Sequence, residues 1–150
     1  MLLSKSCVYG LRASLFLASS QDGEFISIKQ LSDKLDLSFH FLTKILQQLT
    51  AVDLLESLKG PNGGVRLSKP AKGISLLDIV VAIDGDELFY KCVLGLPGCG
   101  KDKPCPLHNI WTATRDDIRE MLETNNLVDM AKKGKQGNLR ITADGNFKWT

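Results

Sequence analysis

The chain has 150 residues, of which 43% are hydrophobic and 24% charged, with a formal net charge of +2. This length and composition fit a single globular domain with an added dimerisation arm. No apolar run reaches membrane-spanning length, and Lys5 and Arg12 interrupt the N-terminal apolar segment, so we expect a cytoplasmic protein without a signal peptide or membrane partner.

Charge is spread unevenly along the chain. Residues 1–75 carry nine Lys and Arg against six Asp and Glu, residues 76–125 carry five against nine, and the last 25 residues carry five against two. A basic front half is typical of an end that faces a polyanion. Ordinary scatter of surface charge is the alternative explanation.

The front half predicts three helices in a helix-turn-helix order. Apolar residues recur at helical spacing after Ser4, and Ser27 is placed to open a short second helix through Leu35. The turn "DLS" leads into "FHFLTKILQQLTA", with Ser38 as its expected cap. The apolar stripe of this third helix leaves its polar residues outward, where a recognition helix contacts DNA bases. Its candidate DNA-binding residues are Ser38, His40, Phe41, Thr43, Lys44 and Gln47.

The segment after this helix predicts a β-hairpin. "VDLLESLKG" and "VRLSKP" have strand character and flank the tight turn "PNGG". A hairpin directly after a helix-turn-helix is a wing, and Lys59, Asn62 and Arg66 are suited to phosphate or minor-groove contacts. An unrelated small domain with an amphipathic helix and a hairpin is the alternative.

Four stretches carry a family resemblance from residue 3 to about residue 124. "YGLRASLFLA", "SFHFLTKILQQL", "LLESLKGPNGGVRLSKPAKGISLLDIVVAID" and the trio Cys92, Cys99 and Cys105 resemble the IscR/NsrR family of bacterial winged-helix transcription regulators. The resemblance implies a homodimer that binds double-stranded DNA at a palindromic operator and senses iron–sulfur, nitric-oxide or redox status. Where iron–sulfur regulators of that family carry an acidic residue and an arginine for DNA reading, this chain has Thr43 and Lys59. Lysine lacks the planar, two-pronged guanidinium of arginine, so the operator sequence of this chain should differ from that of those iron–sulfur regulators.

The segment "KCVLGLPGCGKDKPCPLHNIW" places three cysteines in a Gly-rich and Pro-rich loop. A long irregular loop in a compact domain is often held by a metal. Structural zinc sites usually bring cysteines in closer pairs, and a disulfide is disfavoured in the cytosol. We favour an iron–sulfur cluster, with zinc and thiol redox chemistry as alternatives.

The fourth ligand decides the cluster type. His108 follows Cys105 by one helical turn, and three Cys with one His resemble the [2Fe–2S] ligand set of iron–sulfur-assembly regulators. We therefore expect Cys92, Cys99, Cys105 and His108 to be the ligands. A [4Fe–4S] cluster is the alternative, since nitric-oxide-sensing relatives use an acidic residue of the partner's first helix. Val8 occupies that place here, and its neighbour Cys7 fits better as a core residue.

The remaining chain predicts a dimerisation helix and a tail. Ile110, Trp111, Thr114, Ile118, Met121 and Leu122 recur at helical spacing. The predicted fold class is mainly α with a small β-hairpin. Its parts are a winged helix-turn-helix domain (1–84), a metal-binding loop (85–106), a long dimerisation helix (107–125) and a flexible basic tail (126–150) with a hairpin at Asp144-Gly145.

Enzyme motifs are missing from the sequence. It contains no nucleophile–base constellation, no P-loop and no dinucleotide fingerprint. We therefore expect a DNA-binding transcription regulator that is not an enzyme. A zinc-stabilised or metal-free winged-helix protein without cluster sensing is the alternative.

Overall fold

The computed structural model describes residues 2–20, 23–98, 100 and 102–149. Its first three helices are α1 (Lys5–Ser19), α2 (Ile28–Leu35) and α3 (Phe39–Ala51), in the predicted order. Each begins at an expected serine cap, because a serine oxygen accepts a backbone N–H that the first helical turn leaves without a partner. A left-handed Asp36 ends α2 and forms the tight turn before α3.

The wing follows α3. Strands β1 (Leu55–Leu58) and β2 (Gly64–Leu67) pair antiparallel, with Leu55 opposite Leu67. Val65 also exchanges two backbone hydrogen bonds of 2.9 Å with Ile26, which joins the wing to the loop before α2. A side chain at Gly64 would collide with the Ile26 carbonyl, so glycine permits this close approach. The base of the wing is therefore fixed to the helical body.

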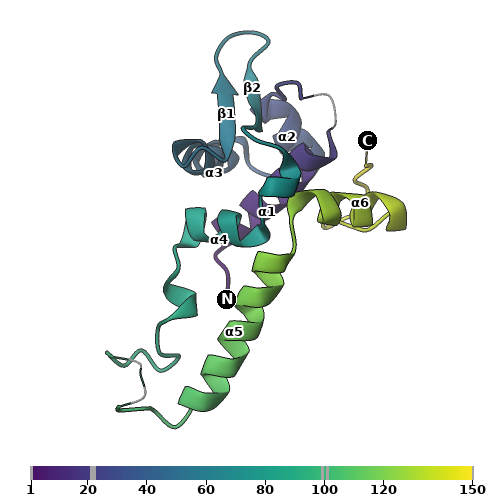
Figure 1. The fold of residues 1–150 in the computed structure, drawn as a ribbon. Coiled ribbons are helices and arrows are strands. Elements are labelled where there is room, and N and C mark those ends of the chain that lie inside the picture. Colours follow the sequence, from purple (N-terminus) through teal and green to yellow (C-terminus); the bar gives the residue numbers. More distant parts are fainter. Residues whose placement is uncertain (1, 21–22, 99, 101, 150) are drawn as a thin grey trace.

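The chain after the wing leads into an arm, formed by the cysteine loop and the helix that follows it, which extends from this body. A short turn η1 (Ala71–Gly73) leads into α4 (Leu76–Asp84), which starts with a two-way capping box between Ser75 and Asp78. The turn η2 (Glu87–Phe89) and the cysteine loop follow, before α5 (His108–Thr124) returns toward the body. Figure 1 shows the loop at the far end of α5.

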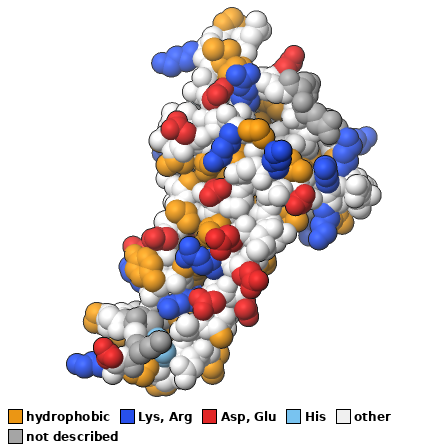
Figure 2. Space-filling model, in the orientation of Figure 1, with side chains coloured by type: hydrophobic (Ala, Val, Ile, Leu, Met, Phe, Trp, Pro, Cys, Tyr) orange, Lys and Arg blue, Asp and Glu red, His pale blue; other side chains and the backbone are white. Residues whose placement is uncertain are grey.

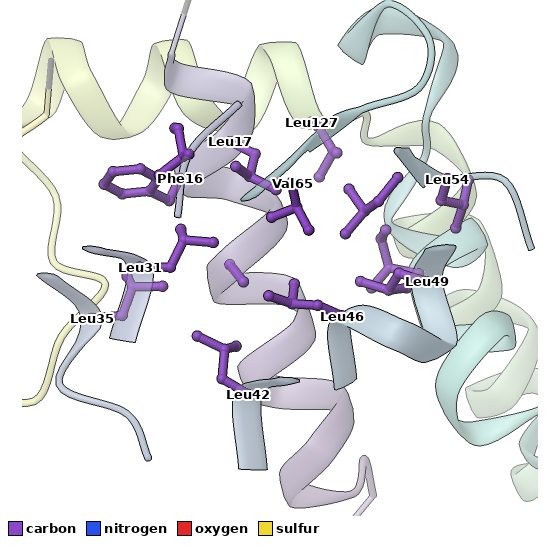
Figure 3. Packing of buried hydrophobic residues seen from close by; sticks show 14 of the residues in the cluster. Phe16, Leu17, Leu31, Leu35, Leu42, Leu46, Leu49, Leu54, Val65 and Leu127 are labelled. Carbon is purple, nitrogen blue, oxygen red and sulfur yellow. The ribbon is translucent and has the colours of Figure 1, made fainter. Parts of the chain in front are cut away.

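The main hydrophobic core lies between the first three helices and the wing. Figure 3 shows side chains from α1, α2, α3 and β2 pointing toward one another, and Leu31, Leu42 and Leu49 are all 0% exposed. A second, smaller cluster contains Cys7, Leu77, Val80, Phe89 and Leu122. It joins α1, α4, η2 and α5, so the arm is attached to the body through this smaller core.

The tail differs from the prediction of a flexible linker followed by a hairpin. Helix α6 (Leu127–Gly137) begins at the Asn126 cap and buries Leu127, Ala131 and Gly134. The segment after it contains a turn at Asp144-Gly145, and none of its described residues belongs to a strand. Phe147 returns to the body, where its ring meets Phe16 edge-on at 5.4 Å. The apolar spacing of α6 and this aromatic contact explain why the segment packs.

The observed architecture is the predicted class, mainly helical with one small hairpin and a winged helix-turn-helix body. Across the described residues, no helix combines the length and apolarity required to cross a membrane.

Candidate DNA interface and cysteine site

A groove of about 580 Å³ runs between α3 and the wing. Its lining includes Thr43 and Gln47 from α3 and Lys59 from the wing, and no Asp or Glu is among its lining residues. Nearby, Lys29 and Asp33 form an ion pair in which both side chains are exposed to solvent. The structure therefore brings three predicted DNA-binding residues to one groove, and none of the described residues that line it is acidic.

The other predicted residues of α3 fall into two groups. His40 and Lys44 are exposed and available to a partner. Ser38 serves as the helix cap, and the half-buried ring of Phe41 packs edge-on against Tyr9 of α1 at 5.6 Å. Ser38 and Phe41 thus orient α3, while the exposed residues present its outer surface.

The wing places its three predicted residues differently. Lys59 and Asn62 are exposed near the tip. Arg66 instead binds Glu56 through Nε and Nη2, both at 3.0 Å, and donates from Nη1 to the Gly23 carbonyl. Its guanidinium also lies 4.3 Å from the centre of the Phe25 ring. These bonds use three of the five N–H groups of the guanidinium, and a phosphate contact by Arg66 stays a prediction.

Helix α1 supplies cations that the sequence interpretation missed. Lys5 and Arg12 both lie over the Tyr9 ring, at 5.6 and 5.4 Å from its centre. The same ring contacts Phe41, so this basic group is attached to the third helix. The spacing of Lys5, Tyr9 and Arg12 on one helical face was the available signal.

The cysteine site brings two predicted ligands together. The Sγ atoms of Cys92 and Cys105 are 3.6 Å apart, although the two residues are 13 positions apart in the sequence. Two thiolates on one tetrahedral metal, with metal–sulfur bonds of about 2.3 Å, are separated by about 3.8 Å. The pair therefore has the spacing that a sulfur-bound metal centre requires.

The remaining predicted ligands are less fully placed. Cys99 lies outside the described residues, and in the part of the chain that is described no group of three or more His, Cys, Asp and Glu is gathered for a metal. The His108 amide donates to the Cys105 carbonyl at 3.0 Å, so His108 opens α5 directly beside the second cysteine. The donor types fit a soft metal centre, and the complete ligand set stays a prediction.

The cysteine loop is hydrogen-bonded to α5 at the residue before its first cysteine. The Lys91 carbonyl accepts a hydrogen bond from Trp111 Nε1 at 2.9 Å and another from Arg115 Nη1 at 3.2 Å. Neither residue was predicted to contact the loop. Trp111 was assigned to the apolar stripe, and an indole N–H that points back at a loop carbonyl leaves no signature in helical periodicity.

Cys7 is a core residue, as expected. It is 0% exposed, and burial is the main cause that raises the pKa of its thiol from 9.0 to about 12. The charge of Asp84 and a hydrogen bond with it raise that pKa further. A thiol with this pKa stays protonated at neutral pH, which disfavours metal binding because the thiolate is the ligand form.

Helix α5 has two apolar faces. Ile118 and Leu122 pack inward on the second core cluster, and Trp111 faces the loop. Ile110 and Met121 are instead 68% and 55% exposed. Acidic side chains also lie along α5, whereas Lys and Arg gather around the α6 end (Figure 2). The predicted apolar stripe therefore splits, and the described residues leave one half of it exposed.

The chain is similar in sequence to known transcriptional regulators. Residues 3–133 match the family model described as "Rrf2: Iron-dependent Transcriptional regulator". The HTH-type transcriptional regulator NsrR of Oceanobacillus iheyensis is 27% identical over 137 residues, which cover 91% of this chain and 93% of that protein.

Two solved structures have the same fold. CymR, the global cysteine regulator of B. subtilis, superposes with a TM-score of 0.75 at 24% identity, over 87% of this chain and 96% of that chain. The IscR of T. potens superposes with a TM-score of 0.73 at 23% identity, over 90% of this chain and 89% of that chain. At these identities the two structures support the fold.

Proposed function

Because this chain belongs to the Rrf2 family of transcriptional regulators, we propose that its homodimer binds a palindromic operator and senses iron–sulfur, redox or nitric-oxide status through the cysteine loop. Members of this family regulate transcription and are not enzymes, and the same holds for this chain. The observation that carries the sensing proposal is the preformed pair of Cys92 and Cys105 thiols, 3.6 Å apart.

The DNA-reading part of the proposal is supported by the groove between α3 and the wing. In a winged helix, the N-terminal half of the recognition helix enters the major groove and the wing contacts the adjacent backbone or minor groove. Thr43 and Gln47 would read base edges, while Lys44, Lys59 and Asn62 would contact phosphate or the minor groove. His40 is exposed at the entry of α3 and completes this surface.

The dimer is supported by the uncovered face of α5. Ile110 and Met121 expose apolar surface that pairing with a second α5 would bury. A twofold dimer places two recognition helices about one turn of DNA apart, which explains a palindromic operator.

The ligands proposed for the cluster are Cys92, Cys99, Cys105 and His108, with [2Fe–2S] as the favoured type and [4Fe–4S] as the alternative. A bound cluster would supply redox activity and reactivity toward nitric oxide. The chain's part is to present thiolates on a loop whose start is bonded to α5.

The structure also contains a contact path from the loop to α3. Asp84 ends α4 just before the loop, and its carboxylate accepts hydrogen bonds from the Ser4 amide, at 2.8 Å, and the Ser4 hydroxyl at the start of α1. One residue earlier, Ile83 lies against Gly10 of α1, which in turn faces Ile45 of α3. A shift of the loop would therefore reach α1 and α3 through closely packed side chains.

The proposal is tested by anaerobic purification, assay of iron and acid-labile sulfide, and a DNA titration of the loaded and cluster-free forms. An operator selected from random duplexes should bind the two forms with affinities that differ at least about tenfold. Equal affinities would remove the sensing claim, and a lack of iron and sulfide after reconstitution would remove the cluster.

A matched pair of variants separates DNA contact from sensing. Lys59→Ala should weaken operator binding by the loaded and the cluster-free protein equally. It should also reduce the slope of log affinity against log salt concentration by about 1. Cys92→Ala should abolish the difference in operator affinity between the loaded and cluster-free protein, and it should leave the operator affinity of the cluster-free protein unchanged. If Lys59→Ala leaves the salt slope unaltered, the wing is wrongly assigned.

A second candidate is a winged-helix regulator that is metal-free or stabilised by zinc. Its support is the fold that this chain shares with CymR, a protein described as a global cysteine regulator and not as an iron-dependent one. The two candidates differ in colour, since an iron–sulfur protein is brown under anaerobic conditions and zinc or thiol proteins are colourless.

A further inference from the structure

Two side chains of α5 converge on one backbone carbonyl of the cysteine loop. Trp111 Nε1 donates to the Lys91 carbonyl at 2.9 Å and Arg115 Nη1 donates to the same oxygen at 3.2 Å. Residues four apart lie on one face of a helix, so the two donors act from neighbouring turns. A single carbonyl oxygen has two lone pairs, and these two donors use both.

The acceptor belongs to the peptide group that links Lys91 to Cys92. Fixing this planar group fixes the position of the Cys92 Cα atom. The chain then turns immediately, since the Gly95 amide donates to the Cys92 carbonyl at 3.0 Å. The side chain of Lys91 is occupied elsewhere, by an ion pair of 2.7 Å with Glu87.

The second cysteine is fixed by the same helix. The His108 amide donates to the Cys105 carbonyl at 3.0 Å, and this bond continues into the first turn of α5. Both thiols are therefore positioned relative to α5, one through its N-terminal end and the other through its side chains.

We propose that Trp111 and Arg115 are positioning residues that hold the Cys92 thiol beside Cys105 through the Lys91 carbonyl, so that the pair is formed before any metal binds. This inference rests on the proposed function, because it treats the two cysteines as ligands. The distance between the thiols, however, is measurable without a cluster. The pairing of the two thiols depends on α5, so the same helix would both position the ligands and form the proposed dimer contact.

Phenylarsine oxide tests this directly, since its arsenic bonds to two adjacent thiols and its oxygen leaves as water with the two thiol protons. The measurement uses cluster-free full-length protein in a Cys99→Ser background, so that the reagent reports Cys92 and Cys105. Trp111→Phe keeps an aromatic ring and removes the N–H donor. We expect it to weaken arsenical binding about fivefold, the effect of one hydrogen bond, and Trp111→Phe with Arg115→Lys to weaken it more than about tenfold.

The chain offers a matched control at its other tryptophan. Trp149 Nε1 donates to the Leu139 carbonyl at 2.8 Å, a bond of the same kind in the C-terminal segment. Trp149→Phe should leave arsenical affinity unchanged. Arsenical affinity unchanged in Trp111→Phe, or reduced equally in Trp149→Phe, would overturn the proposal.

The buried thiol of Cys7 is an internal control for general loosening of the fold. Its alkylation rate, followed by mass spectrometry, should be the same in Trp111→Phe and the parent, because Cys7 is 0% exposed. A parallel rise in Cys7 alkylation would show that the variant only loosens the fold and would reject the positioning role. Failure of wild-type protein to take up iron and sulfide would instead reject the cluster and leave the arsenical result standing.

Discussion

The winged-helix body and the arm formed by the cysteine loop and α5 are built in different ways. The largest fully buried side chains all lie outside the arm, whereas the 17-residue α5 buries only Leu122. The body therefore has a core of its own, and the arm depends on a small shared cluster, backbone hydrogen bonds and surfaces that a partner would cover. Such a division leaves the DNA-reading body rigid and makes the arm, which is the proposed sensing part, responsive to what binds it.

The largest effect should come from the core of the body. Leu46 is 1% exposed within the main cluster, so Leu46→Ala removes buried apolar volume beneath the middle of α3. We expect a loss of about 3 kcal/mol in the free energy of unfolding. Urea denaturation followed by circular dichroism measures this loss. A loss below about 1 kcal/mol would contradict the view that the body has a self-sufficient core.

The C-terminal segment provides a second, smaller test. Phe147 is 8% exposed and packs edge-on against Phe16 of the body. Phe147→Ala should cost about 2 kcal/mol, less than a central cavity, because a terminal segment relaxes by detaching locally. Faster hydrogen exchange confined to residues 138–149 would accompany the loss. Unchanged stability would support the mobile tail that the sequence suggested.

Features set by local chemistry were predictable in the body. Three serine caps and the "PNGG" turn appear where the sequence places them, because capping and tight turns depend on only a few neighbouring residues. The tail was predicted wrongly because its order depends on distant partners. Phe147 meets Phe16, and the Trp149 ring occupies the space beside Gly134. The apolar spacing of Leu127, Ala131 and Gly134 was a readable signal, hidden by the intervening lysines.

The candidate site was predictable in its residue types and only partly in its contacts. The spacing of the cysteines and the single nearby histidine indicated a metal loop, and the structure brings Cys92 to Cys105. No pattern indicated that Trp111 bonds a loop carbonyl or that Arg66 binds Glu56 and the Gly23 carbonyl. These contacts join segments that are far apart in sequence, and side-chain direction decides them.

The exposed face of α5 gives a third prediction, on the arm. Ile110 is 68% exposed, so Ile110→Asp should leave the stability of the monomer within about 0.5 kcal/mol of the parent. If α5 forms the dimer, a buried aspartate should raise the dimer dissociation constant at least about tenfold, or about 1.4 kcal/mol. Analytical ultracentrifugation measures the constant, with Asn109→Asp on the same helix as a charge-matched control. An unchanged constant would move the dimer contact away from this face.

The smallest effect concerns Cys7, at the junction of the body and the arm. Its folded pKa of about 12 exceeds the ordinary value of 9.0, so the folded chain keeps a proton that the unfolded chain loses. This stabilisation is complete below pH 9 and decreases as the pH rises toward 12, because the folded state then binds more protons than the unfolded state.

Between about pH 9 and pH 10 the wild type should therefore lose about 1 kcal/mol of unfolding free energy relative to Cys7→Ala, which has no thiol to titrate. Comparing the two proteins cancels the ionisation of Lys and Tyr over the same range. Stability curves that stay parallel up to pH 10 would mean that Cys7 is solvated in the folded chain. The second core cluster would then be too open to transmit a change in the loop to α1, and the path through Asp84 and Ser4 would have to carry the coupling alone.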